Sequence, residues 1–469
     1  MANSTYQDVT EEQIRTNSYA AMVPGQTIVE IPRYELECGE ILLDFPVAYK
    51  TWGRLNKSRD NVLLICHALT GSSDVQDWWG PLLGTGLTFD PSRFFIICIN
   101  FLGSPYGSCS PVTVDKSTGK PYGPAFPLVT VKDDIGVQKL ILDSLGVEKI
   151  ACVIGGSMGG MAALEYSSTY QGTGYVKSVI ALATAARASA WCISWNETQR
   201  QCIFSDPNYD DGYYHETPGL RPDSGLSAAR MAALLTYRSR NSFETRFGRK
   251  LPSSIKSSPS TSQDIRLPRN KDEENWLMHN DGARSSSRQV STTSLKSSSN
   301  SDKPQTYFTA QSYLRYQGDK FVARFDANCY ISISRKLDTH DITRGHIDID
   351  ENSEEDPLPG YLESLTLPHL VIGITSDGLF TYGEQQLLGK YLPNNVLKTL
   401  DSPEGHDAFL LDFEIIDEYC RAFLHEKLPE FYDNSGKVEP FEDWKDYVVS
   451  VENGGNSVFG EAEKNITNW

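Results

Sequence analysis

The chain alternates between short, almost wholly apolar runs and longer amphipathic segments. The apolar runs cover residues 61–67, 94–100, 149–154 and 176–183. Their length and their content of Val, Ile and Phe are typical of strands buried on both faces, as in a parallel sheet. Apolar residues at helical spacing fill 131–145 and 161–170, and an earlier run at 41–49 indicates one strand of a hairpin. This alternation predicts a doubly wound α/β sheet, that is, a mostly parallel one.

The pattern changes after residue 186. Helical spacing and clustered aromatic residues dominate from 187 to 340, so we expect an inserted helical lid. Within it, residues 251–304 contain 15 serines and few apolar residues. Such a composition cannot bury enough surface to offset the entropy of ordering, which predicts a disordered insert. The segment 341–366 is acidic and loop-like.

The sheet pattern returns near the end of the chain. We expect strands at 368–374 and 396–400 and helices at 382–391 and 413–427. The predicted organisation therefore has four parts, with the following bounds: a first part of the core at 1–186 that begins with a peripheral extension at 1–30, the lid at 187–340, a second part of the core at 341–427, and an acidic tail at 428–469.

Composition narrows the class of function. The chain has 469 residues, with 43 Lys and Arg against 61 Asp and Glu, a net charge of −18. So acidic a surface repels nucleic acid and anionic lipid, and we expect neither as a partner. Nine cysteines without a C-x-x-C pair favour reduced thiols and no metal site. No run approaches 18 apolar residues and the N-terminus lacks a basic, apolar leader, so we expect a cytoplasmic protein.

The most informative motif is Gly155-Gly156-Ser157-Met158-Gly159. It matches G-x-S-x-G, and it lies between a predicted strand and a predicted helix. In that context small neighbours permit a sharp turn that exposes a serine hydroxyl at the top of the sheet. The helix N-terminus behind the turn favours developing negative charge. No Lys-Ser or Lys-Thr pair follows, so a phosphate-binding loop does not fit. The motif therefore predicts that Ser157 is a nucleophile.

A nucleophilic serine needs a base, and the base needs an acid to orient it. Around such a turn they follow in the order Ser, Asp, His, each after a strand. His406 lies in a loop after the strand at 396–400, whereas His369 and His425 fall within structural elements. Asp377 ends the strand at 368–374. Its rival, Asp401, belongs to the strand that leads to the histidine itself. We expect Asp377 and His406 to complete a triad.

The tetrahedral intermediate of acyl transfer needs two backbone N–H donors. The residue after the nucleophile, Met158, supplies one, and a loop after an earlier strand supplies the other. The loop at 67–71, His-Ala-Leu-Thr-Gly, suits this role, and Leu69 is the expected donor. We expect His67 to shape this loop rather than to transfer protons.

Several segments together resemble the homoserine O-acetyltransferases, in particular their fungal forms. They are GGSMGG (155–160), CHALTGSSD (66–74), DWWGPLLG (77–84), the stretch Ser227–Ser239, RYQGDKFVARFDANCY (315–330), SDGLF (376–380) and SPEGHDAFLL (402–411). The resemblance covers about residues 20–425 apart from the serine-rich insert. It implies an α/β-hydrolase fold with a helical lid and a two-step transfer of acetyl from acetyl-CoA to L-homoserine, toward methionine.

Residue by residue, the resemblance puts the family's nucleophile, acid and base on the three residues already chosen. It further implies that Arg230 binds the substrate carboxylate, that Tyr237 lies beside it, and that Asp407 faces the substrate ammonium. A guanidinium suits a carboxylate because it offers two parallel hydrogen bonds. No cofactor is expected beyond acetyl-CoA as co-substrate, and we expect a homodimer.

Three alternatives stay open on the sequence alone. The acceptor could be L-serine, which differs from homoserine by one methylene, worth about 1–3 kcal/mol in a pocket. The donor could be succinyl-CoA. The same three residues could also serve an esterase with water as acceptor. A non-catalytic scaffold is disfavoured by the intact order of Ser, Asp and His.

Overall fold

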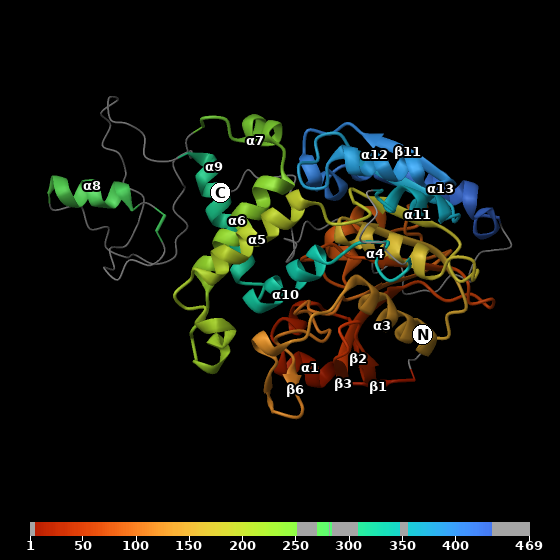
Figure 1. Ribbon diagram of the computed structural model, residues 1–469, viewed down its shortest axis with the longest axis horizontal. Helices are drawn as coiled ribbons and strands as arrows, with labels where there is room; N and C mark the ends of the chain where they lie inside the picture. The colour runs from red at the N-terminus through yellow and green to blue at the C-terminus, as the bar shows by residue number, and fades with distance from the viewer. Residues whose placement is uncertain (1–4, 251–269, 281, 284–307, 348–354, 434–469) are drawn as a thin grey trace.

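A nine-stranded sheet forms the centre of the protein. The computed structural model describes residues 5–250, 270–280, 282–283, 308–347 and 355–433 (Figure 1). The strand order is β1-β2-β3-β5-β4-β8-β9-β10-β11. The strands are β1 (Gln7–Asp8), β2 (Thr27–Glu35), β3 (Ile41–Trp52), β4 (Val62–Cys66), β5 (Phe95–Ile99), β8 (Ile150–Gly156), β9 (Val179–Leu182), β10 (His369–Ile374) and β11 (Asn395–Leu400). A separate two-stranded ribbon pairs β6 (Val114–Asp115) with β7 (Lys120–Pro121).

The pairing confirms the predicted mostly parallel sheet. From β5 through β4, β8, β9 and β10 to β11 every neighbouring pair is parallel. Only the β1–β2–β3 end, including the predicted hairpin, runs antiparallel, as does its junction with β5. Every residue of β4, β5, β8, β9 and β10 is buried, which explains why these strands read as continuous apolar runs.

Helices cover both faces of this sheet. Apolar side chains of α3 (Val131–Ser144), α4 (Met158–Thr169), α11 (Leu358–Ser364) and α12 (Tyr382–Tyr391) pack on one face. On the other face lie α2 (Val75–Trp79) and α13 (Phe413–Lys427). A further short helix, α1 (Thr10–Thr16), precedes β2. The core is therefore two apolar layers separated by the sheet.

The chain leaves the sheet after β9 and forms the helical lid. Its helices are α5 (Ala190–Phe204), α6 (Asp223–Tyr237), α7 (Arg240–Arg246), α8 (Lys271–His279), α9 (Thr309–Val322) and α10 (Ala327–Asp338). Helix α6 packs between α5 and α9. Figure 1 shows α5, α6, α9 and α10 gathered beside the sheet, on the side away from α12 and α13.

Some segments differ from their sequence predictions. Helix α4 begins at Met158, immediately after the turn at Ser157, rather than at residue 161. The acidic segment 341–366 contains α11, whose Leu358 and Leu362 are buried. The extension 1–30, expected to be peripheral, places Ala20 and Val23 in the core. Helix α4 starts earlier than predicted because its first turn contains Gly159 and Gly160, which are poor helix formers. The acidic segment and the N-terminal extension contain few apolar residues, so they show little periodicity to detect.

The serine-rich insert lies mostly outside the described residues, as does most of the acidic tail. Within the insert the structure describes α8, at 271–279. The chain leaves for the insert at Lys250 and returns at Thr309, whose backbone N–H donates to the Lys250 carbonyl at 3.0 Å. The two ends of the insert therefore meet at one place on the lid.

Candidate active site

Ser157 occupies a strained turn between β8 and α4. Its backbone has φ 59° and ψ −126°, a conformation that a residue with a Cβ adopts at a cost of order 1–3 kcal/mol. The surroundings enforce it: a Cβ on Gly155 would lie 2.1 Å from the Gly159 carbonyl oxygen, and one on Gly159 would lie 2.1 Å from that of Cys66. Glycine at both positions lets the strand and the helix approach closely enough to hold the turn.

The structure brings the three predicted residues into one hydrogen-bonded series. His406 Nε2 lies 2.9 Å from the Ser157 hydroxyl, and His406 Nδ1 lies 2.8 Å from Asp377 Oδ2. All three residues are buried. His406 belongs to a 3₁₀ segment at Gly405–Leu410, and Asp377 follows β10. Asp401 instead accepts a hydrogen bond from the Thr375 hydroxyl.

Gln385, on α12, holds the Asp377 carboxylate in place, and the sequence analysis did not identify it. Its side-chain amide donates to Asp377 Oδ2 at 3.1 Å and to the Phe380 carbonyl at 2.8 Å, while its oxygen accepts from the Ile374 N–H at 2.6 Å. The one available signal is that Gln385 shares a buried helix face with Leu388, where an amide needs polar partners.

The pKa of His406 depends on its burial and on two nearby carboxylates. Burial disfavours the imidazolium form and lowers the pKa of His406, but the carboxylates of Asp377 and Asp407 more than offset this, so the pKa is raised above its usual 6.5. Aromatic rings of Tyr237, Phe380 and Phe409 surround the imidazole at centroid distances of 5.9, 5.4 and 5.3 Å. The His406 imidazole therefore lies in a largely apolar enclosure.

The two expected oxyanion donors lie at neighbouring points of the fold. Met158 is the first residue of α4, so its N–H has no acceptor within that helix. Leu69 follows β4, which pairs with β8 beside it, with Cys66 opposite Gly155. Both residues therefore lie at the carboxyl ends of adjacent parallel strands, at the same edge of the sheet as Ser157.

The lid contributes the expected carboxylate-binding residues from one face of α6. Arg230 is 1% exposed, and its guanidinium lies 5.5 Å from the ring centroid of Tyr237 and 4.9 Å from that of Phe321. Because Tyr237 also contacts His406, the lid places this buried cation one ring away from the His406 imidazole.

Asp407 has a partner that sequence reasoning did not anticipate. Its Oδ2 lies 2.8 Å from Arg238 Nε, and Arg238 also pairs with Glu404 at 2.8 Å. Glu404 in turn binds Arg246 at 2.7 Å. Alternating charges therefore link the loop of the base to α6 and α7. Arg238 follows Tyr237 directly, but only the fold shows that it turns toward the base.

No group of three or more His, Cys, Asp or Glu in the described ranges is arranged to hold a metal ion. All nine cysteines are free thiols, and seven of them are buried. Among the described helices, none is long and apolar enough to cross a membrane.

Comparisons with known proteins place this geometry among relatives. Residues 61–413 match the family model described as the alpha/beta hydrolase fold. The chain is 50% identical to a homoserine O-acetyltransferase of Saccharomyces cerevisiae, with 100% of this chain and 99% of that protein covered. It is 46% identical to the one of Schizosaccharomyces pombe, with 97% and 96% covered.

Solved structures confirm the predicted fold. A homoserine O-acetyltransferase from Bacillus anthracis superposes with a TM-score of 0.65 at 21% identity, covering 89% of this chain and 99% of that one. Esterase E22 superposes equally well, with a TM-score of 0.65 at 24% identity, covering 85% and 99%. The fold by itself therefore does not distinguish a transferase from an esterase.

Proposed function

The chain belongs to the homoserine O-acetyltransferases of the α/β-hydrolase fold, and from this premise we propose how its own residues carry out the reaction. The enzyme transfers an acetyl group to homoserine, giving O-acetylhomoserine. The proposal assigns the donor as acetyl-CoA, the carrier as Ser157, the base as His406 and its orienting acid as Asp377. The observation that supports it most is the hydrogen-bonded series of these three buried residues.

In the first half-reaction, His406 Nε2 takes the Ser157 proton while the serine oxygen attacks the thioester carbonyl. The N–H groups of Leu69 and Met158 stabilise the resulting oxyanion. The intermediate collapses when the C–S bond breaks, and His406 returns the proton to the CoA thiolate. Asp377 keeps the Nδ1–H of the imidazole in place and stabilises its charged form.

In the second half-reaction, the homoserine hydroxyl takes the place of the serine. His406 removes its proton, the oxygen attacks the acetyl carbonyl, and the Ser157 oxygen leaves with that proton. Arg230 binds the substrate carboxylate, and Asp407 faces the ammonium. A carboxylate can accept about four hydrogen bonds, so Asp407 can bind the ammonium while it remains paired with Arg238.

One experiment separates this function from its alternatives. The enzyme is mixed with radiolabelled acetyl-CoA, and thiol release is followed with homoserine, with serine or with no acceptor. We expect the label on Ser157, and we expect sustained thiol release only when homoserine is the acceptor. Sustained release without an acceptor would instead make the protein an esterase, and rapid release with serine would change the acceptor. Succinyl-CoA replaces acetyl-CoA in a parallel series.

Ser157→Ala is the matched control, because it removes only the hydroxyl. The variant should keep the fold, as judged by circular dichroism, and lose both labelling and turnover. Retained turnover, or label on another residue of the wild type, would refute the covalent route.

A further inference from the structure

His67 uses both of its ring nitrogens to hold backbone groups. The residue is 0% exposed, with Nδ1 2.8 Å from the Ala68 carbonyl oxygen and Nε2 3.0 Å from the Phe101 amide nitrogen. A carbonyl can only accept and an amide N–H can only donate, so Nδ1 carries the proton and Nε2 accepts. An imidazole bound in this way is committed to structure and is not poised to exchange protons with a substrate.

The carbonyl that His67 holds belongs to the same peptide unit as the Leu69 N–H. Because that unit is planar and trans, its C=O and its N–H point in opposite directions. A second donor, the Gly71 N–H, reaches the Ala68 oxygen at 3.0 Å. Two hydrogen bonds on the carbonyl therefore determine where the Leu69 N–H points.

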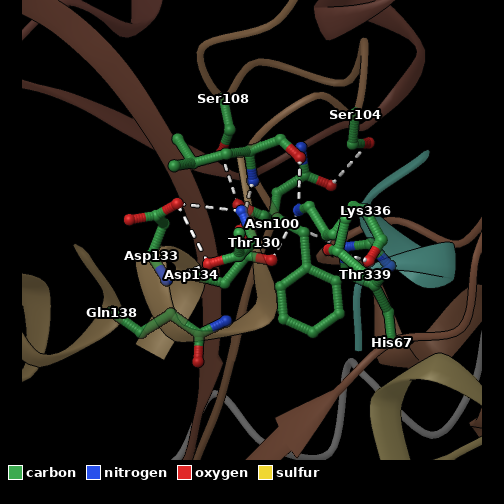
Figure 2. Close-up of polar contacts among 12 residues, drawn as sticks. His67, Asn100, Ser104, Ser108, Thr130, Asp133, Asp134, Gln138, Lys336 and Thr339 are labelled. Atoms are coloured by element: carbon green, nitrogen blue, oxygen red, sulfur yellow. Dashed lines mark hydrogen bonds and ion pairs between the residues drawn. The ribbon is translucent and has the colours of Figure 1, made fainter. Parts of the chain in front are cut away.

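The next link extends from His67 toward the lid. Phe101, whose N–H His67 accepts, is followed by Leu102, and Leu102 is held on both sides. Its N–H donates to Asp134 Oδ1 at 2.9 Å, and its carbonyl accepts from Lys336 Nζ at 2.7 Å. Figure 2 shows His67, Asp134 and Lys336 within one group of polar contacts.

Asp134 and Lys336 come from different parts of the molecule. Asp134 lies on α3 of the core and Lys336 on α10 of the lid, and they form an ion pair of 2.5 Å in which both side chains are buried. Burial raises the pKa of Asp134 and lowers that of Lys336, and the attraction between the two charges opposes both shifts. A buried pair contributes little net stability, but loss of one partner is costly. Its clearest structural consequence is therefore geometric: through this pair, the position of α10 is linked to the position of Leu102.

We propose that His67 is the positioning residue for the Leu69 oxyanion donor, and that the Lys336–Asp134 pair makes its placement depend on the seated lid. This inference rests on the proposed function, because it takes Leu69 as an oxyanion donor. Both half-reactions pass through an oxyanion at the same place. Misplacement of the donor must therefore slow both by a similar factor while substrate affinity changes little.

Two substitutions of His67 divide its contacts. In His67→Asn the amide nitrogen sits near the place of Nδ1 and can still donate to Ala68, whereas in His67→Gln the amide oxygen can still accept from Phe101. The glutamine variant loses the bond that orients the peptide. We expect it to lower the rates of acylation and of deacylation each by about 10²-fold, the scale of a lost or misplaced oxyanion donor. The asparagine variant should lose about tenfold or less.

The matched control is His369→Gln. His369 is also fully buried and bonded through Nε2, to the Ser167 hydroxyl at 2.9 Å, but it lies at the opposite end of the sheet, at the start of β10. Rates are corrected for the folded fraction. An equal loss in His369→Gln, a loss confined to one half-reaction, or unchanged rates in His67→Gln would each overturn the inference. A His67→Gln variant that loses the pH dependence of the rate would make His67 a proton donor or acceptor instead.

The lid link is tested by Lys336→Met alone and together with Asp134→Leu, which removes both buried charges. We expect both variants to slow the two half-reactions by a common factor of about 10 or more, with KM for homoserine nearly unchanged. Normal rates in a folded double variant would overturn the link. If wild-type enzyme formed no acetyl-Ser157, the proposed function would fail and the inference with it. If the wild-type enzyme forms acetyl-Ser157 but the His67 and Lys336 variants react at normal rates, the inference fails and the proposed function stands.

Discussion

Arg230 offers the sharpest test of acceptor recognition, because only one half-reaction uses a homoserine carboxylate. The perturbation is Arg230→Met, which keeps an unbranched chain between the rings of Tyr237 and Phe321 and removes the charge. Arg230→Ala removes the packing as well. Arg230→Lys keeps the charge but not the planar fork, and should restore only part of the rate.

The magnitude follows from burial. The side chain is 1% exposed, so its bond to a carboxylate is shielded from water. A hydrogen bond to a charged group contributes about 1.5–3 kcal/mol, and about 1.4 kcal/mol corresponds to a factor of ten. Transfer from acetyl-Ser157 to homoserine should therefore slow by ~10- to ~150-fold in Arg230→Met. Acylation by acetyl-CoA should change less than threefold or so, because the donor has no carboxylate at this position.

The assay measures the two steps separately in a quench-flow instrument. Acylation is read from the burst of CoA release without acceptor, and deacylation from the loss of label after homoserine is added to the acetyl-enzyme. Arg200→Met is a matched control, since Arg200 is another buried lid arginine, paired with Asp338 at 2.7 Å. It should lower stability without selecting one step. If Arg230→Met slowed acylation alone, the reasoning would be refuted, and Arg230 would be assigned to the binding of CoA.

Three further predictions concern the base, its support and the insert. Asp377→Asn removes the charge that offsets burial at His406, so the acidic limb of the pH–rate profile should move to lower pH while kcat falls by orders of magnitude; a limb that stays in place or moves up, measured from pH 5 to 9, would contradict this. The sign follows because the base must be neutral, and a lower pKa keeps it neutral at lower pH. Gln385→Leu should lower the free energy of unfolding by about 2–5 kcal/mol, since two buried backbone groups lose a partner, and it should lower kcat more than KM. Denaturant titration measures the first effect and steady-state kinetics the second. An unchanged kcat would show that Gln385 does not help to position Asp377. Replacing 252–303 by a short Gly-Ser linker should leave kcat and KM within about twofold, because shortening a loop whose ends already meet costs little entropy; a large fall in turnover at normal stability would show that the insert acts at the site.

The sequence determined the parts of the site that depend on local order along the chain. Buried strands need continuous apolar runs, and in a parallel sheet their carboxyl ends meet at one edge. Ser157 and Asp377 each follow such a run, and His406 follows the last parallel strand, β11, so their meeting could be predicted without knowing the contacts. The glycines around Ser157 likewise predicted the sharp turn from the local sequence, because no side chain fits where β8 and α4 approach each other.

The tertiary structure alone decided which polar groups support those residues. Gln385 reaches Asp377 from a helix, and Lys336 reaches Leu102 from the lid across more than two hundred residues of sequence. The pairing of Arg238 with Asp407 likewise joins the lid to the loop of the base. Such contacts leave no periodic trace, because a single buried polar side chain is compatible with any partner that satisfies its hydrogen bonds. Which partner it finds depends on how distant elements pack, and that is settled only when the core and the lid are assembled.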